Sequence, residues 1–393
     1  MRSLRILFFL ASLLLGPAAH CLEYSLNGDL TLFRGFRNLR ENNASDYVSV
    51  DDSVGVFGLG TKIQIPSWTL DVKGRVIASY GPGLGVDPTD PAYLDMGSPP
   101  RFLSWQSQVQ RSSNTQVLTD FEKAYLMFQK GNFEFSAGRR AVGIGTLKYL
   151  PIWNRFVPTI AHIGGPALIY NPDDVQASYQ FKKYAISGIH IEGATPDDNI
   201  SILMNTWYLD WIEIHALAAY WWQRETAGVA FTKDFEGLTL RGESLFFQDQ
   251  TDKNKVQGQG GLGIEYAFSP KFSIVTEAMY SSIGANSISQ YSTAVPDKFA
   301  LLNADGYVFA ILEYMPFDFW KFSLGSLVNL VDSSFLGLAE IKYSWSENLD
   351  LSLQLKQPVG KDGQEFGSDF YRVTEDINFG YSQQLAGQLN YYF

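Results

Sequence analysis

The chain has 393 residues, is 46% hydrophobic and 15% aromatic, and carries a formal net charge of -11 at pH 7. Such an acidic chain lacks the basic surface that nucleic-acid binding needs. Beyond the amino terminus it has no apolar stretch of about 18 residues that could form a membrane-spanning helix.

The first 21 residues are typical of a secretory signal peptide. Arg2 and Arg5 precede an apolar run at residues 6–15, and small residues follow up to Cys21. We expect cleavage after Cys21, with either preceding alanine as an alternative site and a lipidated Cys21 as a further alternative. Cleavage after Cys21 removes the one cysteine of the chain, which excludes disulfides and thiolate catalysis. It also removes two positive charges and no negative one, so the net charge becomes more negative.

Alternating side chains recur along the rest of the sequence. In residues 68–80 one face is apolar from Trp68 to Tyr80, and the other carries Asp71, Lys73 and Arg75. Because successive side chains of a strand point to opposite faces, this pattern fits a membrane wall with a charged interior behind it. Further clear cases lie at residues 24–34, 272–280 and 349–356.

Short turns and longer connections alternate between these segments. We place the short turns at residues 66–67, 131–132, 182–183, 209–210, 233–234, 269–270, 316–318 and 346–348. We place the longer connections at residues 37–53, 81–117, 141–174, 193–199, 223–226, 248–258, 282–304, 329–334 and 358–382. Eight inner turns and nine outer loops predict eighteen strands, with sixteen as the alternative, and put both chain ends on the periplasmic side.

The chain ends on an alternating segment, residues 384–393, with Tyr391 and Phe393 as terminal aromatics. It resembles the carboxy-terminal signal of bacterial outer-membrane β-barrel proteins, although the usual glycine position is occupied by Gln388 and the glycine is Gly387. The resemblance implies that Tyr391 and Phe393 serve as an assembly signal for the barrel-assembly machinery. It also implies that this last strand pairs with the strand at residues 24–34 to close the barrel.

The fold class predicted from these patterns is all-β: one transmembrane antiparallel up-and-down β-barrel over residues 22–393, with no plug or periplasmic domain. The 21 Tyr, 28 Phe and 9 Trp agree with this fold, because a membrane barrel needs two girdles of aromatic residues. A barrel of sixteen to eighteen strands leaves a water-filled channel.

The chain therefore resembles the bacterial porins, general or substrate-specific. The resemblance implies an outer-membrane location with lipid around the barrel, passive diffusion of small hydrophilic solutes and ions, and either a homotrimer or a monomer. Two alternatives stay open at this point. One is a substrate-specific channel or a polysaccharide-export conduit, and the other is a structural or adhesive protein that does not conduct.

The connection at residues 141–174 is the predicted constriction loop. It is rich in glycine, proline and apolar residues, so we expect it to pack inside the barrel rather than extend into water. An outer cap or a contact between protomers is the alternative. Positive charge at the constriction is expected from Lys148 and Arg155 and from the neighbouring Arg139 and Arg140.

Facing acidic residues are expected on the inward faces of other strands. The predicted inward carboxylates are Glu134, Glu243, Glu265, Glu277, Glu313 and Glu340, and the predicted inward arginines are Arg75 and Arg241. Opposed rows of arginine and glutamate create a transverse field that selects ions by their sign. A local salt bridge in the lumen is the alternative for each of them.

The sequence indicates no enzyme, cofactor or metal site. The acidic segment at residues 87–95 lacks a regular ligand spacing, and we interpret it as a solvated loop or a latch onto a neighbouring protomer. His190 falls near a strand end, and His215 shares a face with Glu213. No Gly-x-Ser-x-Gly element accompanies them, so we predict that the chain is not a hydrolase.

Overall fold

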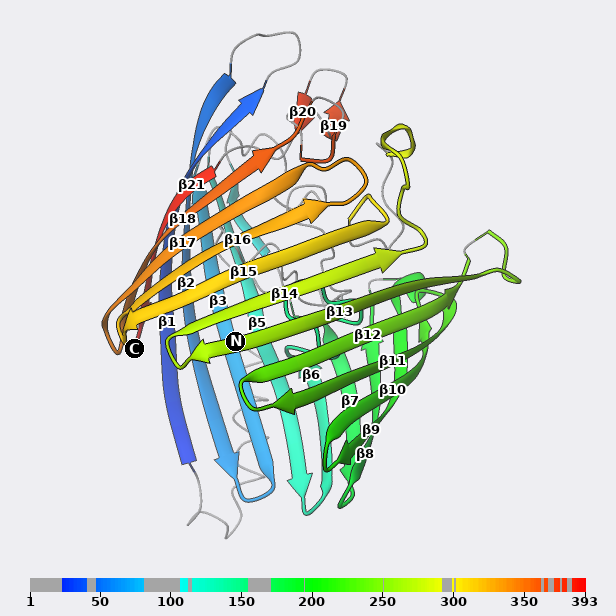
Figure 1. Ribbon diagram of the computed structural model, residues 1–393. Helices are drawn as coiled ribbons and strands as arrows, with labels where there is room; N and C mark the ends of the chain where they lie inside the picture. Colours follow the sequence, from blue (N-terminus) through cyan, green and yellow to red (C-terminus); the bar gives the residue numbers. More distant parts are fainter. Residues whose placement is uncertain are drawn as a thin grey trace.

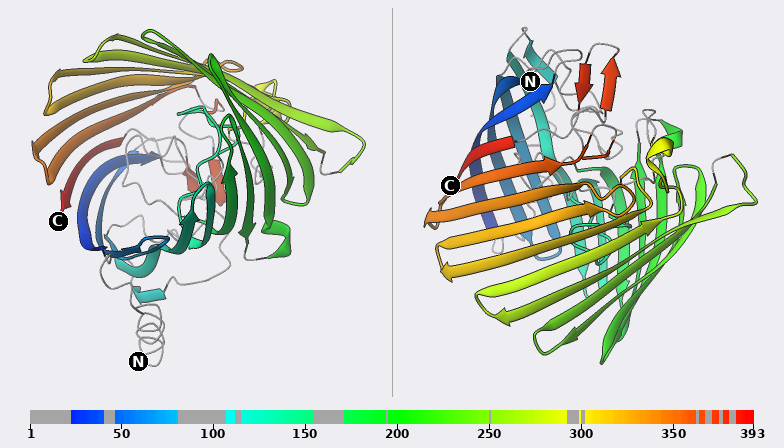
Figure 2. Two further views of the ribbon diagram at one scale, coloured as in Figure 1. Left: turned by 90° about the horizontal axis from the view of Figure 1, so that it is seen from below. Right: turned by 45° about the horizontal axis from the view of Figure 1, so that its top comes forward.

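The computed structural model describes the chain as a ring of strands (Figures 1 and 2). The described residues are 23–40, 47–80, 107–111, 115–154, 171–193, 195–249, 251–291, 299, 302–361, 364–366, 371–374, 377–379 and 384–393. The strands of the ring are β1 (Glu23–Arg40), β2 (Tyr47–Ile65), β3 (Trp68–Tyr80), β5 (Thr115–Lys130), β6 (Phe133–Arg139), β7 (Asp173–Gln180), β8 (Tyr184–Glu192), β9 (Ile200–Leu209), β10 (Ile212–Trp221), β11 (Arg224–Phe235), β12 (Leu238–Gln248), β13 (Val256–Ser269), β14 (Phe272–Ser281), β15 (Gly306–Phe317), β16 (Trp320–Asn329), β17 (Phe335–Ser346), β18 (Leu349–Val359) and β21 (Gln384–Tyr392).

Every strand of the ring pairs antiparallel with its neighbours along the chain, and the last strand closes the ring onto the first. Residues Gln384 to Tyr392 of β21 pair with Arg37 to Asp29 of β1, while the other edge of β21 pairs with β18. The result is a closed 18-strand antiparallel barrel. The predicted fold class, the strand number and the pairing of the last strand with the first are therefore confirmed.

The outer connections contain smaller elements of secondary structure. β4 (Ser107–Arg111) pairs with β5 alone, and β19 (Tyr371–Thr374) and β20 (Ile377–Phe379) form a separate two-stranded sheet. Single turns of 3₁₀ helix lie at Pro196–Asp198 and Ile288–Gln290. No helix among the described residues is long and apolar enough to cross a membrane.

Several strand boundaries differ from the predicted ones. The turn expected at residues 233–234 was wrong, because β11 continues to Phe235 and the turn is Glu236-Gly237, where Gly237 has a φ of +76°. Glycine adopts this left-handed conformation at no steric cost, which places the reversal there. The connections predicted at 37–53 and 81–117 are shorter than expected, because β1 extends to Arg40, β2 begins at Tyr47 and β5 begins at Thr115.

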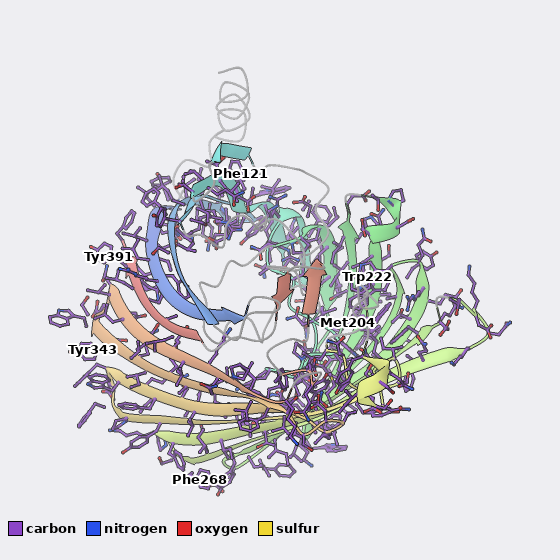
Figure 3. The ribbon with its side chains drawn as sticks, turned by 90° about the horizontal axis from the view of Figure 1, so that it is seen from above. Phe121, Met204, Trp222, Phe268, Tyr343 and Tyr391 are labelled. Atoms are coloured by element: carbon purple, nitrogen blue, oxygen red, sulfur yellow. The ribbon has the colours of Figure 1, made fainter. Side chains whose placement is uncertain are left out.

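Large apolar side chains cover the outside of the ring, as a wall facing lipid requires. Phe268, Tyr343 and Tyr391 lie on the outside in Figure 3, whereas Met204 lies on the inside. Aromatic rings cluster at one end of strands β13 to β17. The ring centroids of Phe268 and Phe272 lie 5.0 Å apart, and those of Tyr343 and Trp320 lie 4.7 Å apart. We infer that these rings form the girdle at one membrane interface.

The carboxy-terminal residue is fixed at the seam of the barrel. Phe393 exchanges backbone hydrogen bonds of 2.8 and 3.0 Å with Gly28, and its ring stacks near those of Tyr391 and Phe57. A Cβ atom at Gly28 would lie within 2.3 Å of the Phe393 ring. Glycine at this position therefore leaves the space that the terminal aromatic occupies.

Candidate pore-lining site

After β6 the chain turns into the interior of the ring and runs against the inner faces of β11 to β14 (Figure 2). Leu150, Ile152 and Trp153 are fully buried there. The Trp153 indole N–H donates to the backbone oxygen of Ser244 at 2.9 Å. We call residues 144–153 the inner loop.

The carboxylate of Glu243 on β12 accepts hydrogen bonds from backbone N–H groups of the inner loop. Its Oε1 accepts the N–H groups of Thr146 and, at 2.7 Å, Leu147. Its Oε2 accepts those of Ile152 at 2.8 Å and Trp153 at 3.0 Å. One carboxylate thus binds both ends of the inner loop. It accepts hydrogen bonds from four N–H groups that would otherwise be buried without acceptors.

Glu277 on β14 repeats this role for the middle of the inner loop. Its Oε1 accepts the Lys148 N–H at 2.7 Å. Its Oε2 accepts the N–H groups of Tyr149 at 2.9 Å and Leu150 at 2.7 Å. Glu243 and Glu277 are 4% and 1% exposed, so these carboxylates are occupied by the loop and do not face open water.

Glycines make room for the inner loop. Gly145 has a φ of +97°, and a Cβ atom there would lie 2.5 Å from Glu243 Oε1 and 3.1 Å from Trp153. On the wall, a Cβ atom at Gly261 would lie 2.7 Å from Leu147 and 3.1 Å from Ile152. Because side chains at either position would displace the loop, its seat depends on these glycines.

One charged cluster of the inner loop remains partly exposed. Lys148 Nζ donates to both oxygens of Glu265 at 2.8 and 2.7 Å, and Arg241 Nη1 lies 2.7 Å from Glu265 Oε2. The Lys148 side chain is 42% exposed. Two cations therefore share one carboxylate at the lumen.

The wall built by β3, β5, β6 and β7 carries a buried chain of ion pairs. Asp120 accepts from Arg75 Nη2 at 2.9 Å and from Arg139 Nη1 at 3.2 Å. Arg139 also binds Asp173 with two parallel bonds of 2.8 and 3.0 Å. Gly138, just before Arg139, has a φ of +129°, a conformation that L side chains rarely adopt. It marks the point where the regular alternation of β6 ends.

Three further cations of this wall form ion pairs. Arg140 Nε donates to Asp174 Oδ2 at 3.2 Å, and its Nη2 donates to the Gln176 amide oxygen. The other two are Lys73 with Asp29 and, at 2.9 Å, Glu122, and Lys123 with Asp71 at 2.7 Å. These cations are thus paired with acids of the same wall or of β1, not with acids across the lumen.

The remaining predicted residues are distributed over the ring. Glu313 pairs with Lys321 at 2.6 Å, and Glu340 accepts from the Gln354 amide at 2.8 Å. Glu134 is half-buried on β6. Arg155 lies outside the described residues. The structure therefore brings Lys148, Arg241 and Glu265 together, and Arg75 together with Arg139, but it joins Lys148 to a different wall from Arg139 and Arg140.

The acidic partners on the charged wall were not singled out from the sequence. Asp120, Glu122, Asp173 and Asp174 all bind cations, yet the prediction considered only glutamates as facing acids. A register shift between β3 and β5 near Gly74 interrupts the alternation, so that Lys73 pairs with Lys123 while Gly74 pairs with Phe121. The signal that could have found Asp120 is its place on the same face as Arg75, once one extra residue is allowed.

A second buried polar cluster lies at the outer ends of β15 and β16. Glu365 is fully buried and accepts from the Tyr307 hydroxyl at 2.5 Å, the Asn329 amide at 2.7 Å and the Asn303 N–H at 3.2 Å. Burial raises the pKa of the Glu365 carboxyl to about 7, and the neighbouring Asp332 carboxylate adds to the effect. This carboxyl attaches an outer connection to the rim of the barrel.

No protein-family model matches the chain, and no curated protein matches it. Solved structures of outer-membrane channels do share its fold. A BenF-like porin from Pseudomonas fluorescens Pf-5 superposes with a TM-score of 0.57 at 10% identity, over 94% of this chain and 98% of that chain. OccK9 (OpdG) from Pseudomonas aeruginosa gives 0.55 at 11% identity, and OccAB4 from Acinetobacter baumannii gives 0.54 at 8%, both with the same coverage of the two chains. The chain therefore has the fold of the outer-membrane porins.

Proposed function

We propose that the chain is a bacterial outer-membrane porin, a water-filled channel for passive diffusion of small hydrophilic solutes and ions. The observation that carries the proposal is the ring of eighteen strands with a charged inner face. A barrel of about eight strands closes on its own side chains, whereas one of sixteen to eighteen leaves an aqueous path. Transport is then the activity of the lumen.

The inner loop is the proposed constriction of this channel. It is fixed to one side of the interior by Glu243 and Glu277, so it narrows the lumen without filling the ring. Lys148 extends from it toward Glu265 with a partly exposed side chain. The exposed charges at the narrowest part are then those of Lys148 and Arg241 with Glu265, whereas Arg75 and Arg139 are buried with their acids in the opposite wall.

A substrate-specific channel is the second candidate. It is favoured by the partly exposed Lys148 ammonium group, because a cationic group at a fixed place in a pore can bind a small anion. The paired charges of the opposite wall favour the general channel, because each cation there already has an acid.

Other parts of the proposal rest on the sequence. We propose that residues 1–21 are a cleaved signal peptide, and that Tyr391 and Phe393 serve the barrel-assembly machinery. The seat of Phe393 over Gly28 supports this role of the carboxy terminus. A homotrimer is the assembly proposed by analogy with porins.

Swelling of proteoliposomes tests the proposed function. Liposomes that contain the refolded protein should swell in isotonic solutions of small sugars, and the rate should fall steeply with sugar size. Equal rates for uncharged and anionic solutes of one size support the general channel, whereas a faster anion supports the specific one. No swelling with any solute, from protein that is shown to be folded, contradicts both and favours a structural or adhesive role.

A further inference from the structure

One histidine on the outside of the barrel has a serine and a glutamate as partners. His190 of β8 and Ser201 of β9 are direct cross-strand neighbours, on adjacent strands of the ring (Figure 1). Ser201 Oγ lies 2.8 Å from His190 Nδ1, and His190 Nε2 lies 2.9 Å from Glu192 Oε2. The three side chains thus form a continuous hydrogen-bonded chain.

The three side chains face outward, away from the lumen. Met204, three residues after Ser201 on the same strand, lies inside the ring (Figure 3), so alternation places Ser201 outside. On β8 the flanking residues Ile189 and Ile191 are buried, whereas the His190 side chain is 46% exposed. The triad therefore lies on the face that the barrel presents to lipid, near the outer ends of its strands.

The proton positions follow from the partners. An ionised carboxylate only accepts hydrogen bonds, so the imidazole nitrogen that faces Glu192 carries the proton. His190 Nδ1 is then the acceptor for the Ser201 hydroxyl. Glu192 is itself held by the Asn199 amide at 3.3 Å, and the Asn199 oxygen accepts the Gly193 N–H at 2.8 Å. A nucleophile, a base and an oriented acid in this order are the arrangement of a serine hydrolase.

A shallow, mostly apolar groove on the outer face includes His190 and Ser201. Its volume is about 610 Å³, and its lining includes His190 and Ser201 together with Ala177, Gly188, Leu203 and Ala218. These are outward positions of β7 to β10. A Cβ atom at Gly188 would meet nothing within 4 Å, so the floor of the groove is open to an extended chain. On the lipid-facing wall such a groove suits an acyl chain.

We propose that Ser201, His190 and Glu192 form a lipid-facing esterase site that hydrolyses an acyl ester of a membrane lipid. Ser201 Oγ attacks the ester carbonyl carbon while His190 Nδ1 takes the serine proton. The tetrahedral intermediate expels the lipid alkoxide, which receives that proton from His190, and an acyl-serine remains. Water then attacks the acyl-serine with His190 as the base, and the fatty acid leaves as Ser201 regains its proton. Ester and water thus give acid and alcohol.

The other residues have supporting roles. Glu192 is a positioning residue, because it holds the ring and stabilises the imidazolium without touching the ester. Tyr220 of β10 is the cross-strand partner of Ser201 on the outward face, and we assign its hydroxyl to the carbonyl oxygen that becomes negative during the attack. The sequence lacks a Gly-x-Ser-x-Gly element, and for that reason we predicted no hydrolase. That element describes a serine at a turn between a strand and a helix, so its absence does not exclude a nucleophile on a strand.

A matched control exists inside the barrel. Thr206 Oγ1 lies 3.0 Å from His215 Nδ1, and His215 Nε2 lies 3.2 Å from Glu213 Oε1. This trio repeats the chemistry of the proposed site with a threonine as its hydroxyl, but it lies on the inward face. A His215→Asn variant should therefore leave hydrolysis of membrane lipid unchanged.

The full chain, refolded into phospholipid vesicles that contain a fluorogenic acyl-ester lipid, tests the proposal. We expect equal release of fatty acid and lysolipid, and a loss of about a thousandfold or more in Ser201→Ala and His190→Asn. Glu192→Gln should lower kcat and leave KM nearly unchanged, because the imidazolium that forms during the attack then lacks its anionic partner. A fluorophosphonate should label Ser201 in wild type and not in His190→Asn.

Two outcomes overturn the proposal. One is hydrolysis that persists at the wild-type rate in Ser201→Ala, and the other is failure of the fluorophosphonate to label Ser201 in protein that is folded by its gel mobility before and after heating. Either would assign the trio to the structure of the barrel rim. Because proteoliposome swelling does not depend on Ser201, the channel proposal is judged separately.

Discussion

Carboxylates on two sides of the barrel interior bind different partners. On the wall of β3, β5, β6 and β7, Asp120 and Asp173 bind guanidinium groups. On the wall of β12 and β14, Glu243 and Glu277 bind backbone N–H groups of the inner loop. The first arrangement neutralises the wall, and the second positions a segment of chain. The same residue types on inward strand positions thus have distinct roles, which are decided by what lies opposite them.

Removal of Arg139 should have the largest effect. Arg139→Met removes the buried guanidinium that Asp173 and one oxygen of Asp120 bind, and we expect a loss of about 3 to 5 kcal/mol in the free energy of unfolding. Lys183→Met is the matched control, because the Lys183–Asp210 pair is exposed on both sides and should cost less than about 1 kcal/mol. Urea titration in detergent micelles measures both. Equal losses would contradict the contrast between buried and exposed pairs.

Substitution of Glu243 should act on the loop and spare the wall. Glu243→Gln replaces one oxygen by an amide NH₂, so two loop N–H groups lose their acceptor at a cost of about 1 to 3 kcal/mol each. We expect faster hydrogen exchange at residues 146, 147, 152 and 153, with the β3 to β7 wall unchanged. Unaltered exchange in the loop would show that its apolar contacts alone hold it.

A methyl group under the loop should have a smaller effect. Gly261→Ala brings a Cβ atom to 2.7 Å from Leu147, 3.1 Å from Ile152 and 3.1 Å from a backbone oxygen, and we expect a loss of about 1 to 3 kcal/mol through displacement of the loop. Gly188→Ala, where a Cβ atom meets nothing within 4 Å, is the control. The two variants should differ in thermal midpoint. If they do not, the loop is not seated on Gly261.

At the outer rim the Glu365 carboxyl also holds a connection, through hydrogen bonds from the Tyr307 hydroxyl, the Asn329 amide and the Asn303 N–H. When residues 364–366 are docked on the barrel rim, the pKa of the Glu365 carboxyl is about 7, above its ordinary value of 4.5. Docking of this segment is therefore coupled to the uptake of a proton. Docking is therefore favoured at low pH and weakens as the pH rises through 7, by about tenfold between pH 6 and pH 8. Protection factors of amides 364–366 should follow this course and become flat in Glu365→Gln. A wild-type profile as flat as that of the variant would contradict it.

Glu265 should have the smallest effect on stability. Glu265→Gln removes a partly exposed negative charge between Lys148 and Arg241, so folding should change by less than about 1 kcal/mol. The reversal potential in a salt gradient should shift toward anion preference. Glu347→Gln, at an exposed turn outside the lumen, is the control and should leave the potential unchanged. A shift of equal size in the control would assign it to surface charge.

The fold was predictable because its signals are local. The apolar positions of residues 68–80 and the polar turn at residues 131–132 identify strands without knowledge of their partners, and the terminal segment indicates how the ring closes. The partners of the charged residues were not predictable. Glu243 and Thr146 are 97 residues apart in the sequence. The pairing of Arg75 with Asp120 depends on a register shift that the alternation of side chains does not reveal. Which face a side chain occupies can be read from alternation, whereas what it binds depends on the path of the loop.

Single-channel recording in planar bilayers tests the central claim most directly. The wild-type protein should give discrete open steps without ligand, and the double variant Glu243→Gln, Glu277→Gln should give larger steps because the inner loop loses its attachment to the wall. Heat-dependent gel mobility confirms that both are folded barrels. We expect a clear increase in unit conductance for the double variant. Silence of the wild type at every voltage, or identical steps in the two proteins, would contradict a channel that is narrowed by the inner loop.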